Sequence, residues 1–283
     1  MKRILSLFLS LIFVLSLSAC GEQTVQSVID DARDYIEDVK NVHVSTMTGM
    51  DMSDKNGNVS SLLAMEADLD IKNKTNYVNM VSTSNDKELA IEMYVDTSTT
   101  PPNYYIGTGD KWLRLDSVYP EANMDFDSDL SRDFAIYFDE LAMNAETEMT
   151  VEELEGDDYF KLHAPVTIRS FDMAKQFSME SFITGYLGED ASESTITSVL
   201  ELLGPVDVTV YINCKTYEPY GFVLDLKPAL DGLYTKLQIS DVTVTEAYSS
   251  AVYTYYNESE VVIPEKVLNA QNMSDVSNKM GGN

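Results

Sequence analysis

The feature that most constrains the fold is a two-residue alternation of apolar and polar side chains, which begins at Val42 and recurs as far as Asp96. Such alternation is typical of strands with one buried and one exposed face. Short polar turns interrupt it, and the first contains Asn56-Gly57, which supplies the positive φ of a hairpin turn. Successive strands joined by short turns predict an antiparallel meander. The expected strands are residues 42–52, 59–71, 77–83 and 88–96.

Helical patterns flank this meander. Residues 24–41 carry apolar side chains at three- and four-residue spacing with acidic ones opposite. This pattern predicts an amphipathic helix packed on its own domain, because a helix lying on a membrane prefers a basic polar face. An apolar stripe from Leu130 to Leu141 predicts a second helix. A weaker pattern predicts a helix over residues 170–187, and a clearer one predicts a helix over residues 194–203.

Strands return in the rest of the chain. Further strands are expected at residues 104–106, 112–115, 146–154, 159–168, 206–214, 220–227, 233–247 (with a bulge at Ser240-Asp241) and 252–256. No low-complexity linker divides the sequence. We therefore expect one α+β domain over residues 24–270, followed by a polar tail, residues 271–283.

The chain is strongly acidic, with 47 Asp and Glu against 19 Lys and Arg, a formal net charge of −28. Such a charge repels the phosphates of nucleic acids and anionic lipid headgroups, which excludes a nucleic-acid partner. A well-solvated surface explains the charge, and attraction of metal cations or of a basic partner is the alternative. Hydrophobic residues make up 44% of the chain, enough for a sizeable core.

The N-terminal segment is typical of a secretory signal. Lys2 and Arg3 precede an apolar run, residues 4–17, that is short for a membrane span. The sequence Leu17-Ser18-Ala19-Cys20 then resembles the lipobox of bacterial lipoproteins. The resemblance implies cleavage before Cys20 and a diacylglycerol thioether on its sulfur. An ordinary signal peptide with a chance cysteine, or an uncleaved anchor, is the alternative.

Lipidation of Cys20 has consequences for the whole chain. Residues 1–19 would be the signal peptide and residues 20–23 a lipidated linker, with the protein held at the extracytoplasmic face of the cell membrane. Cys214 would then have no partner for an intrachain disulfide. Its place in the alternation of the preceding strand predicts that it points inward as a small apolar residue rather than a reactive thiol.

Catalytic motifs are weak. His43 and His163 each fall in an expected strand, where a structural or exposed role is favoured over catalysis. Ser84 and Lys87 have Ser-x-x-Lys spacing, but they lie in an expected turn, whereas penicillin-binding enzymes need that serine at the start of a helix. We therefore expect no enzymatic activity and no cofactor.

One acidic segment has the beginning of a calcium loop. Asp125, Asp127 and Asp129 follow an Asp-x-Asp-x-Asp pattern, but Leu130 and Ile136 occupy the positions at which an EF-hand needs glycine and glutamate. The EF-hand is excluded. The carboxylates are explained by their place before the expected helix, whose N-terminus favours negative charge. A loose calcium site is the alternative, and no metal site is predicted.

Two segments resemble lipoproteins of the LolA/LppX-like superfamily. Residues 104–115 are similar to their aromatic strand, short turn, Asp-Lys-Trp and returning strand. Residues 211–219 are similar to their Trp/Tyr-Ile-Asp-x-Lys-Thr-x-x-Pro hairpin, with Asn213 where aspartate is usual and Cys214 in the variable place. The order of expected elements also matches. The resemblance implies a strongly curved antiparallel sheet, a half-barrel, with helices packed on its concave side.

In such relatives the concavity holds lipid, acyl chains of lipoproteins, or nothing. The resemblance therefore implies a non-enzymatic protein that binds a lipid or acyl chain between sheet and helices. The methionines on the expected strands suit such a cavity and equally suit a core, and Trp112 could equally anchor the sheet to the helices. An envelope scaffold or sensor that binds another protein is the alternative function. The candidate ligand-binding residues are Trp112, Met65, Met93, Phe134, Phe138 and Phe182.

Overall fold

The computed structural model describes residues 23–55, 57–85, 87–115, 130–177, 179, 183, 192–258 and 260–275. The expectations for the signal peptide, Cys20, the acidic segment around Asp127, Phe182 and residues 276–283 lie outside these residues. In the part that is described, no helix is both long enough and apolar enough to cross a membrane.

The described strands form a single open sheet in the order β12-β6-β5-β4-β3-β2-β1-β11-β10-β9-β8-β7. Neighbouring strands run antiparallel, except that β12 runs parallel to β6. The strand bounds are β1 Asn41–Asp54, β2 Gly57–Asp70, β3 Thr75–Ser84, β4 Lys87–Asp96, β5 Asn103–Thr108, β6 Lys111–Leu115, β7 Glu148–Leu154, β8 Asp157–Val166, β9 Val206–Asn213, β10 Pro219–Asp225, β11 Thr243–Thr254 and β12 Gln271–Asn272. The first residues of the expected polar tail thus add to the sheet edge as β12.

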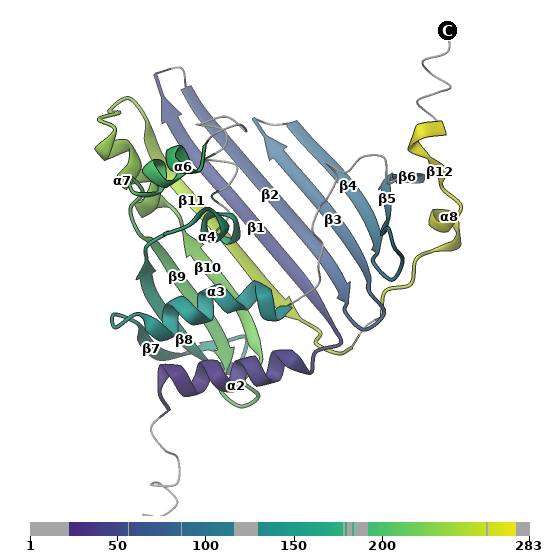
Figure 1. The fold of residues 1–283 in the computed structure, drawn as a ribbon, viewed down its shortest axis with the longest axis horizontal. Coiled ribbons are helices and arrows are strands. Elements are labelled where there is room, and N and C mark those ends of the chain that lie inside the picture. Colours follow the sequence, from purple (N-terminus) through teal and green to yellow (C-terminus); the bar gives the residue numbers. More distant parts are fainter. Residues whose placement is uncertain are drawn as a thin grey trace, which may run out of the picture.

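Apart from α8, which lies beside β6 at the edge of the sheet, the described helices lie on one face of the sheet, which we call the inner face (Figure 1). The helix bounds are α2 Val25–Glu37, α3 Leu130–Met143, α4 Phe171–Gln176, α6 Glu193–Leu200, α7 Lys227–Lys236 and α8 Glu265–Leu268. The helices α2, α3, α4, α6 and α7 gather over β1 and β7–β11 in Figure 1, whereas no described helix lies in front of β2–β5. The fold is therefore α+β, an open half-barrel sheet with helices on one side, as the sequence predicts.

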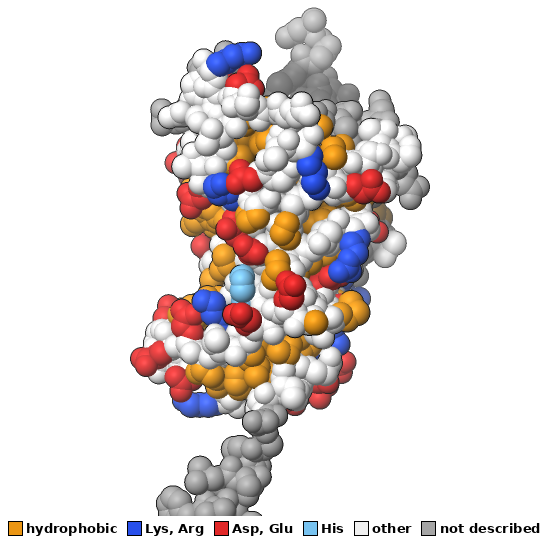
Figure 2. Space-filling model, turned by 90° about the vertical axis from the view of Figure 1, so that its left-hand side faces the viewer, with side chains coloured by type: hydrophobic (Ala, Val, Ile, Leu, Met, Phe, Trp, Pro, Cys, Tyr) orange, Lys and Arg blue, Asp and Glu red, His pale blue; other side chains and the backbone are white. Residues whose placement is uncertain are grey.

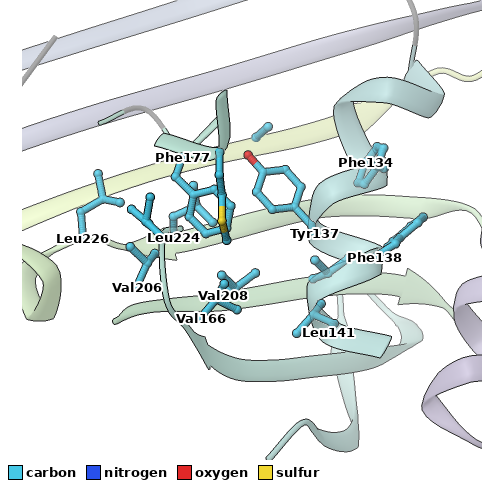
Figure 3. Close-up of a cluster of buried hydrophobic side chains, with 14 of the residues drawn as sticks. Phe134, Tyr137, Phe138, Leu141, Val166, Phe177, Val206, Val208, Leu224 and Leu226 are labelled. Atoms are coloured by element: carbon cyan, nitrogen blue, oxygen red, sulfur yellow. The ribbon is translucent and has the colours of Figure 1, made fainter. Parts of the chain in front are cut away.

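The core lies between these helices and the strands beneath them (Figure 3). In β9 the alternation places four side chains on the inner face, and all four are fully buried: Val206, Val208, Val210 and Ile212. Helix α3 supplies Phe134 and Phe138 from above, which are also fully buried. The helix-covered half of the inner face is thus filled by side chains of the protein itself.

Two hairpins match the segments that carry the family resemblance. Residues 104–115 form the β5–β6 hairpin, and residues 211–219 form the turn from β9 to β10. At that turn the side-chain oxygen of Asn213 accepts hydrogen bonds from the backbone N–H groups of Lys215 and Thr216, at 2.9 and 3.1 Å. An asparagine oxygen can replace a carboxylate there because both accept backbone hydrogen bonds in tight turns.

The expected strand over residues 233–247 is wrong. Its first part belongs to helix α7, in which Leu230 and Leu233 share one buried face. Pro228 occupies the first turn of α7. Backbone N–H groups there have no partner within the helix, so the N–H that proline lacks costs no hydrogen bond. Its last part, from Thr243, joins the expected final strand to form β11. The bulge in β11 lies opposite Asp51 and Met52 of β1, where the register shifts, rather than at Ser240-Asp241.

The surface reflects the acidic composition. Figure 2 views the molecule from the side of α7 and β7, and acidic side chains are spread over this whole face with basic ones between them. Hydrophobic side chains gather at its lower end, the end at which α2 lies in Figure 1.

Candidate functional site

The inner face continues beyond the helices onto strands β2 to β5. Val44 belongs to the helix-covered core, and its neighbour across β2 is Ala67. Ala67 pairs with Val78 on β3, and Val78 pairs with Met93 on β4. Because directly paired residues point to the same side of a sheet, these side chains all lie on the inner face.

Most inward side chains on this part of the sheet are hydrophobic, and the polar or charged ones are Ser61, Asn76, Ser82, Ser84, Lys87 and Thr108. We define the apolar inner strip as the inward side chains of β2–β5 that are hydrophobic. Its members are Val59, Leu63, Met65, Ala67, Leu69, Val78, Met80, Leu89, Ile91, Met93, Val95, Tyr104 and Ile106. By the same alternation no carboxylate occupies an inward position on these strands.

Burial changes along the apolar inner strip. Ala67, Val78, Met93 and Val95 form a small buried cluster, separate from the helix-covered core. Toward the β1–β2 and β3–β4 turns the side chains become exposed: Val59 is 42%, Leu63 40% and Leu89 58% exposed. The strip therefore runs from a buried centre to an open end near the hairpin tips, where Leu63 and Leu89 lie on either side of Ser82.

Two of the candidate ligand-binding residues lie together on this strip. Met65 pairs with Met80 across β3 and packs against the small buried cluster. Met93 is a member of that cluster and is 3% exposed. The structure thus places Met65 and Met93 on the same face of the sheet, with Met93 buried in the small cluster.

Phe134 and Phe138 lie elsewhere. They belong to the helix-covered core of Figure 3, with their rings 5.3 Å apart at the centroids. The ring of Phe134 also lies 4.8 Å from that of Tyr253 on β11. Both phenylalanines are fully buried, so their contacts hold α3 on the sheet.

Trp112 lies on the other side of the sheet, the outer face. Its cross-strand partner is Gly107, which pairs with Glu92. Glu92 is one position from the inward Met93 and therefore points outward. Trp112 therefore lies on the face opposite Met65 and Met93. The strand pairing leads from Trp112 to Glu92, and Glu92 is the neighbour in sequence of Met93, so the two point to opposite faces.

Reactive groups do not gather on the apolar inner strip. His43 lies on the outer face, and its two ring nitrogens face Asp68 and Glu66 at 2.8 and 2.9 Å. Cys214 lies half-buried in the turn after β9, where burial, followed by the charge of Asp158, raises the pKa of its thiol. A raised pKa keeps the sulfur protonated at neutral pH and lowers its reactivity. Among the described residues, no group of ligands suited to a metal ion occurs.

Sequence reasoning missed the open end of the strip. Leu63, Met80, Leu89 and Ile91 share the alternation of Met65 and Met93, so the signal was present in the same strands. Alternation alone does not show which end of each strand the helices leave uncovered.

Comparison with known proteins finds similarity only among solved structures. No protein-family profile matches the sequence, and no curated protein matches it significantly. LprF from Mycobacterium bovis is 12% identical, with 86% of this chain and 97% of that chain covered and a TM-score of 0.47. A putative outer membrane lipoprotein-sorting protein domain from Vibrio parahaemolyticus is 11% identical (85% and 94% covered, TM-score 0.25). A LolA superfamily protein from Nitrosomonas europaea is 10% identical (87% and 97% covered, TM-score 0.22).

Proposed function

We propose that this chain is a membrane-anchored, extracytoplasmic lipoprotein that binds the acyl chain of a lipid on the apolar inner strip. The observation that carries the proposal is the open end of that strip. Leu63 and Leu89 are 40% and 58% exposed on one face, in a protein whose formal net charge is −28. Contiguous apolar surface on an otherwise charged protein marks a place where an apolar partner is bound.

The chemistry of the strip suits an acyl chain. An acyl chain makes no directional hydrogen bonds, and each buried methylene contributes roughly 0.8 kcal/mol. Met65 and Met80 are partly exposed in the middle of the strip, and Met93 is buried near them. Flexible thioether side chains adapt to chains of different length and shape. No carboxylate on the inner face of β2–β5 would oppose an apolar ligand.

The proposed anchor supports a particular orientation. The lipobox-like sequence ends at Cys20, and the linker of residues 21–23 reaches at most about 10 Å. In Figure 1, α2 lies at the end of the molecule opposite the tips of the β1–β2 and β3–β4 hairpins. A chain tethered at Cys20 would therefore hold its open apolar end away from the membrane, toward a donor or acceptor of lipid.

The test is lipid bound to the purified full chain, measured by extraction and mass spectrometry and by uptake of a fluorescent fatty acid. Ser82→Phe adds bulk to the inner face of β3, and Thr83→Phe adds the same bulk to the outer face one residue later. Leu63→Glu and Leu62→Glu form a second matched pair on β2. We expect Ser82→Phe and Leu63→Glu to reduce lipid binding severalfold, and their outward controls to leave it unchanged.

The proposal fails if the wild-type chain carries and takes up no lipid, or if inward and outward variants behave alike. An envelope scaffold that binds protein would then explain the chain better. That alternative predicts that a membrane pull-down with Ser82→Phe recovers the same partner as the wild type.

A further inference from the structure

The outer face of β1–β6 carries many acidic side chains. Its outward positions carry carboxylates on β1, β2 and β4, with Arg114 on β6 as the single lysine or arginine and His43 on β1 as a histidine. These carboxylates are Asp51, Glu66, Asp68, Asp70, Glu88, Glu92 and Asp96. Positive ligands are attracted to such a face, but charge alone does not single out a place on it.

A row of aromatic rings does single out a place. Tyr77 on β3, Tyr94 on β4 and Trp112 on β6 point outward and touch in sequence. The centroids of Tyr77 and Tyr94 are 4.9 Å apart, and those of Tyr94 and Trp112 are 5.3 Å apart. All three side chains are partly exposed, and their rings are tilted by 45° and 49° to one another. They form an open row across the strands rather than an enclosing cage.

Carboxylates border this row. The hydroxyl of Tyr77 donates to Glu92 at 3.5 Å, and Asp68 is the cross-strand neighbour of Tyr77. Burial is the largest cause that raises the pKa of Tyr94, and the negative charges of Glu92 and Asp68 raise it further. The same two carboxylates help to raise the pKa of Tyr77. The rings thus sit in a negative potential.

Little positive charge offsets it. His43 faces Asp68 and Glu66. Among the described bases none forms an ion pair with Glu92. Arg114 lies on the same outer face, two residues from Trp112, and pairs with Tyr105 on β5. The side chain of Asp68 is 39% exposed and that of Glu66 is 55% exposed, so both remain open to a ligand.

We propose that this outer surface, Tyr77, Tyr94, Trp112, Asp68 and Glu92, binds arginine side chains of a partner protein. A planar guanidinium stacks on aromatic rings and donates hydrogen bonds to a carboxylate at the same time. A quaternary ammonium would favour an enclosing cage, and the row is open. The surface lies on the face opposite the apolar inner strip, so this inference does not depend on lipid binding.

Trp112 makes the test direct, because it is the single tryptophan of the chain. The full chain is titrated with a synthetic peptide containing two arginines in a glycine-serine spacer while tryptophan emission is recorded. A peptide with lysine in place of arginine has the same charge and is the first control. We expect saturable change in emission with the arginine peptide and weaker binding of the lysine peptide.

Variants on one strand locate the site. Glu92→Gln is expected to weaken the arginine peptide by up to about fivefold, the range for an exposed ion pair. Glu88→Gln removes the same charge from the same face of β4, four residues nearer the hairpin tip, and is expected to leave binding unchanged. Circular dichroism of each variant verifies that the fold is intact.

Three outcomes would overturn the inference. The first is no change in tryptophan emission with the arginine peptide. The second is equal binding of both peptides. The third is equal weakening by Glu92→Gln and Glu88→Gln, which would mean a general attraction to acidic surface.

Discussion

The indole ring of Trp112 lies directly over Gly107, its cross-strand partner, so closely that a β-carbon on Gly107 would stand 2.6 Å from the ring. The missing side chain on β5 is what lets the ring of a β6 residue lie flat across the sheet. The ring thereby reaches Tyr94 on β4, two strands away. One glycine therefore positions the end of the outer aromatic row.

Gly107→Ala is expected to displace the Trp112 ring. Overpacking at such a contact costs roughly 1–3 kcal/mol of unfolding free energy. Urea denaturation followed by circular dichroism measures the loss, and a shift in tryptophan emission reports the displacement. In a Trp112→Leu background the same glycine substitution should cost clearly less. An equal cost in both backgrounds would show that the indole is not the obstacle.

Phe134→Ala is expected to lower the unfolding free energy by about 3–5 kcal/mol, because it leaves a cavity where a fully buried ring met Phe138 and Tyr253. Met143→Ala, on the same helix but 71% exposed, is the matched control and should change stability by less than about 0.5 kcal/mol. Thermal and denaturant unfolding of both variants compare them. Similar losses in the two variants would contradict the placement of α3.

Asp70 ties the C-terminal segment to the sheet. Its carboxylate is fully buried and accepts hydrogen bonds from the backbone and side chain of Asn73 and from the backbone N–H of Val261, at 2.8–3.1 Å. Asp70→Ala leaves those donors unpaired, at a cost of roughly 1–3 kcal/mol. We expect faster hydrogen exchange at Val261.

Asp54→Ala removes a turn acceptor of the same type, the partner of the Gly57 N–H, at an exposed site. Hydrogen exchange at Val261 should not change in this control. If Asp70→Ala left exchange there unaltered as well, the carboxylate would not be what holds the segment.

Tyr256 predicts a loss of stability at alkaline pH. Its hydroxyl donates to the carbonyl of Pro219 at 2.5 Å, and burial raises its pKa well above 10.0. The unfolded chain therefore releases this proton at lower pH than the folded chain. The stability that Tyr256 contributes is complete below about pH 10 and is lost as the pH rises toward the folded pKa.

Tyr256→Phe cannot release that proton. We expect it to cost about 1 kcal/mol at neutral pH, where a hydrogen bond is lost, and to show a shallower decline of stability above about pH 10. Denaturant unfolding as a function of pH compares the slopes. Parallel slopes for variant and wild type would rule out Tyr256 as a source of the alkaline dependence.

Local patterns carried much of the prediction. The strands β1 and β2 on either side of the turn at Gly57 follow from alternation and from the positive φ of Gly57, which is 134°. Both depend on residues that are neighbours in the sequence. The strand expected over residues 233–247 was wrong because Leu233, Leu237 and Ile239 suit a strand as well as a helix, and contacts with β9 and β11 select the helix α7.

The sequence by itself determined the two-faced strands, their turns and their order, because periodicity and turn chemistry are properties of adjacent residues. Only the tertiary structure decided which face the helices cover and how far along the sheet they extend. The strand register placed Trp112 on the face opposite Met65 and Met93, and the placement of the helices left Leu63 and Leu89 exposed. The physical reason is that alternation along a strand shows only that its two faces differ. Which face becomes buried depends on which distant segments of the chain pack on it.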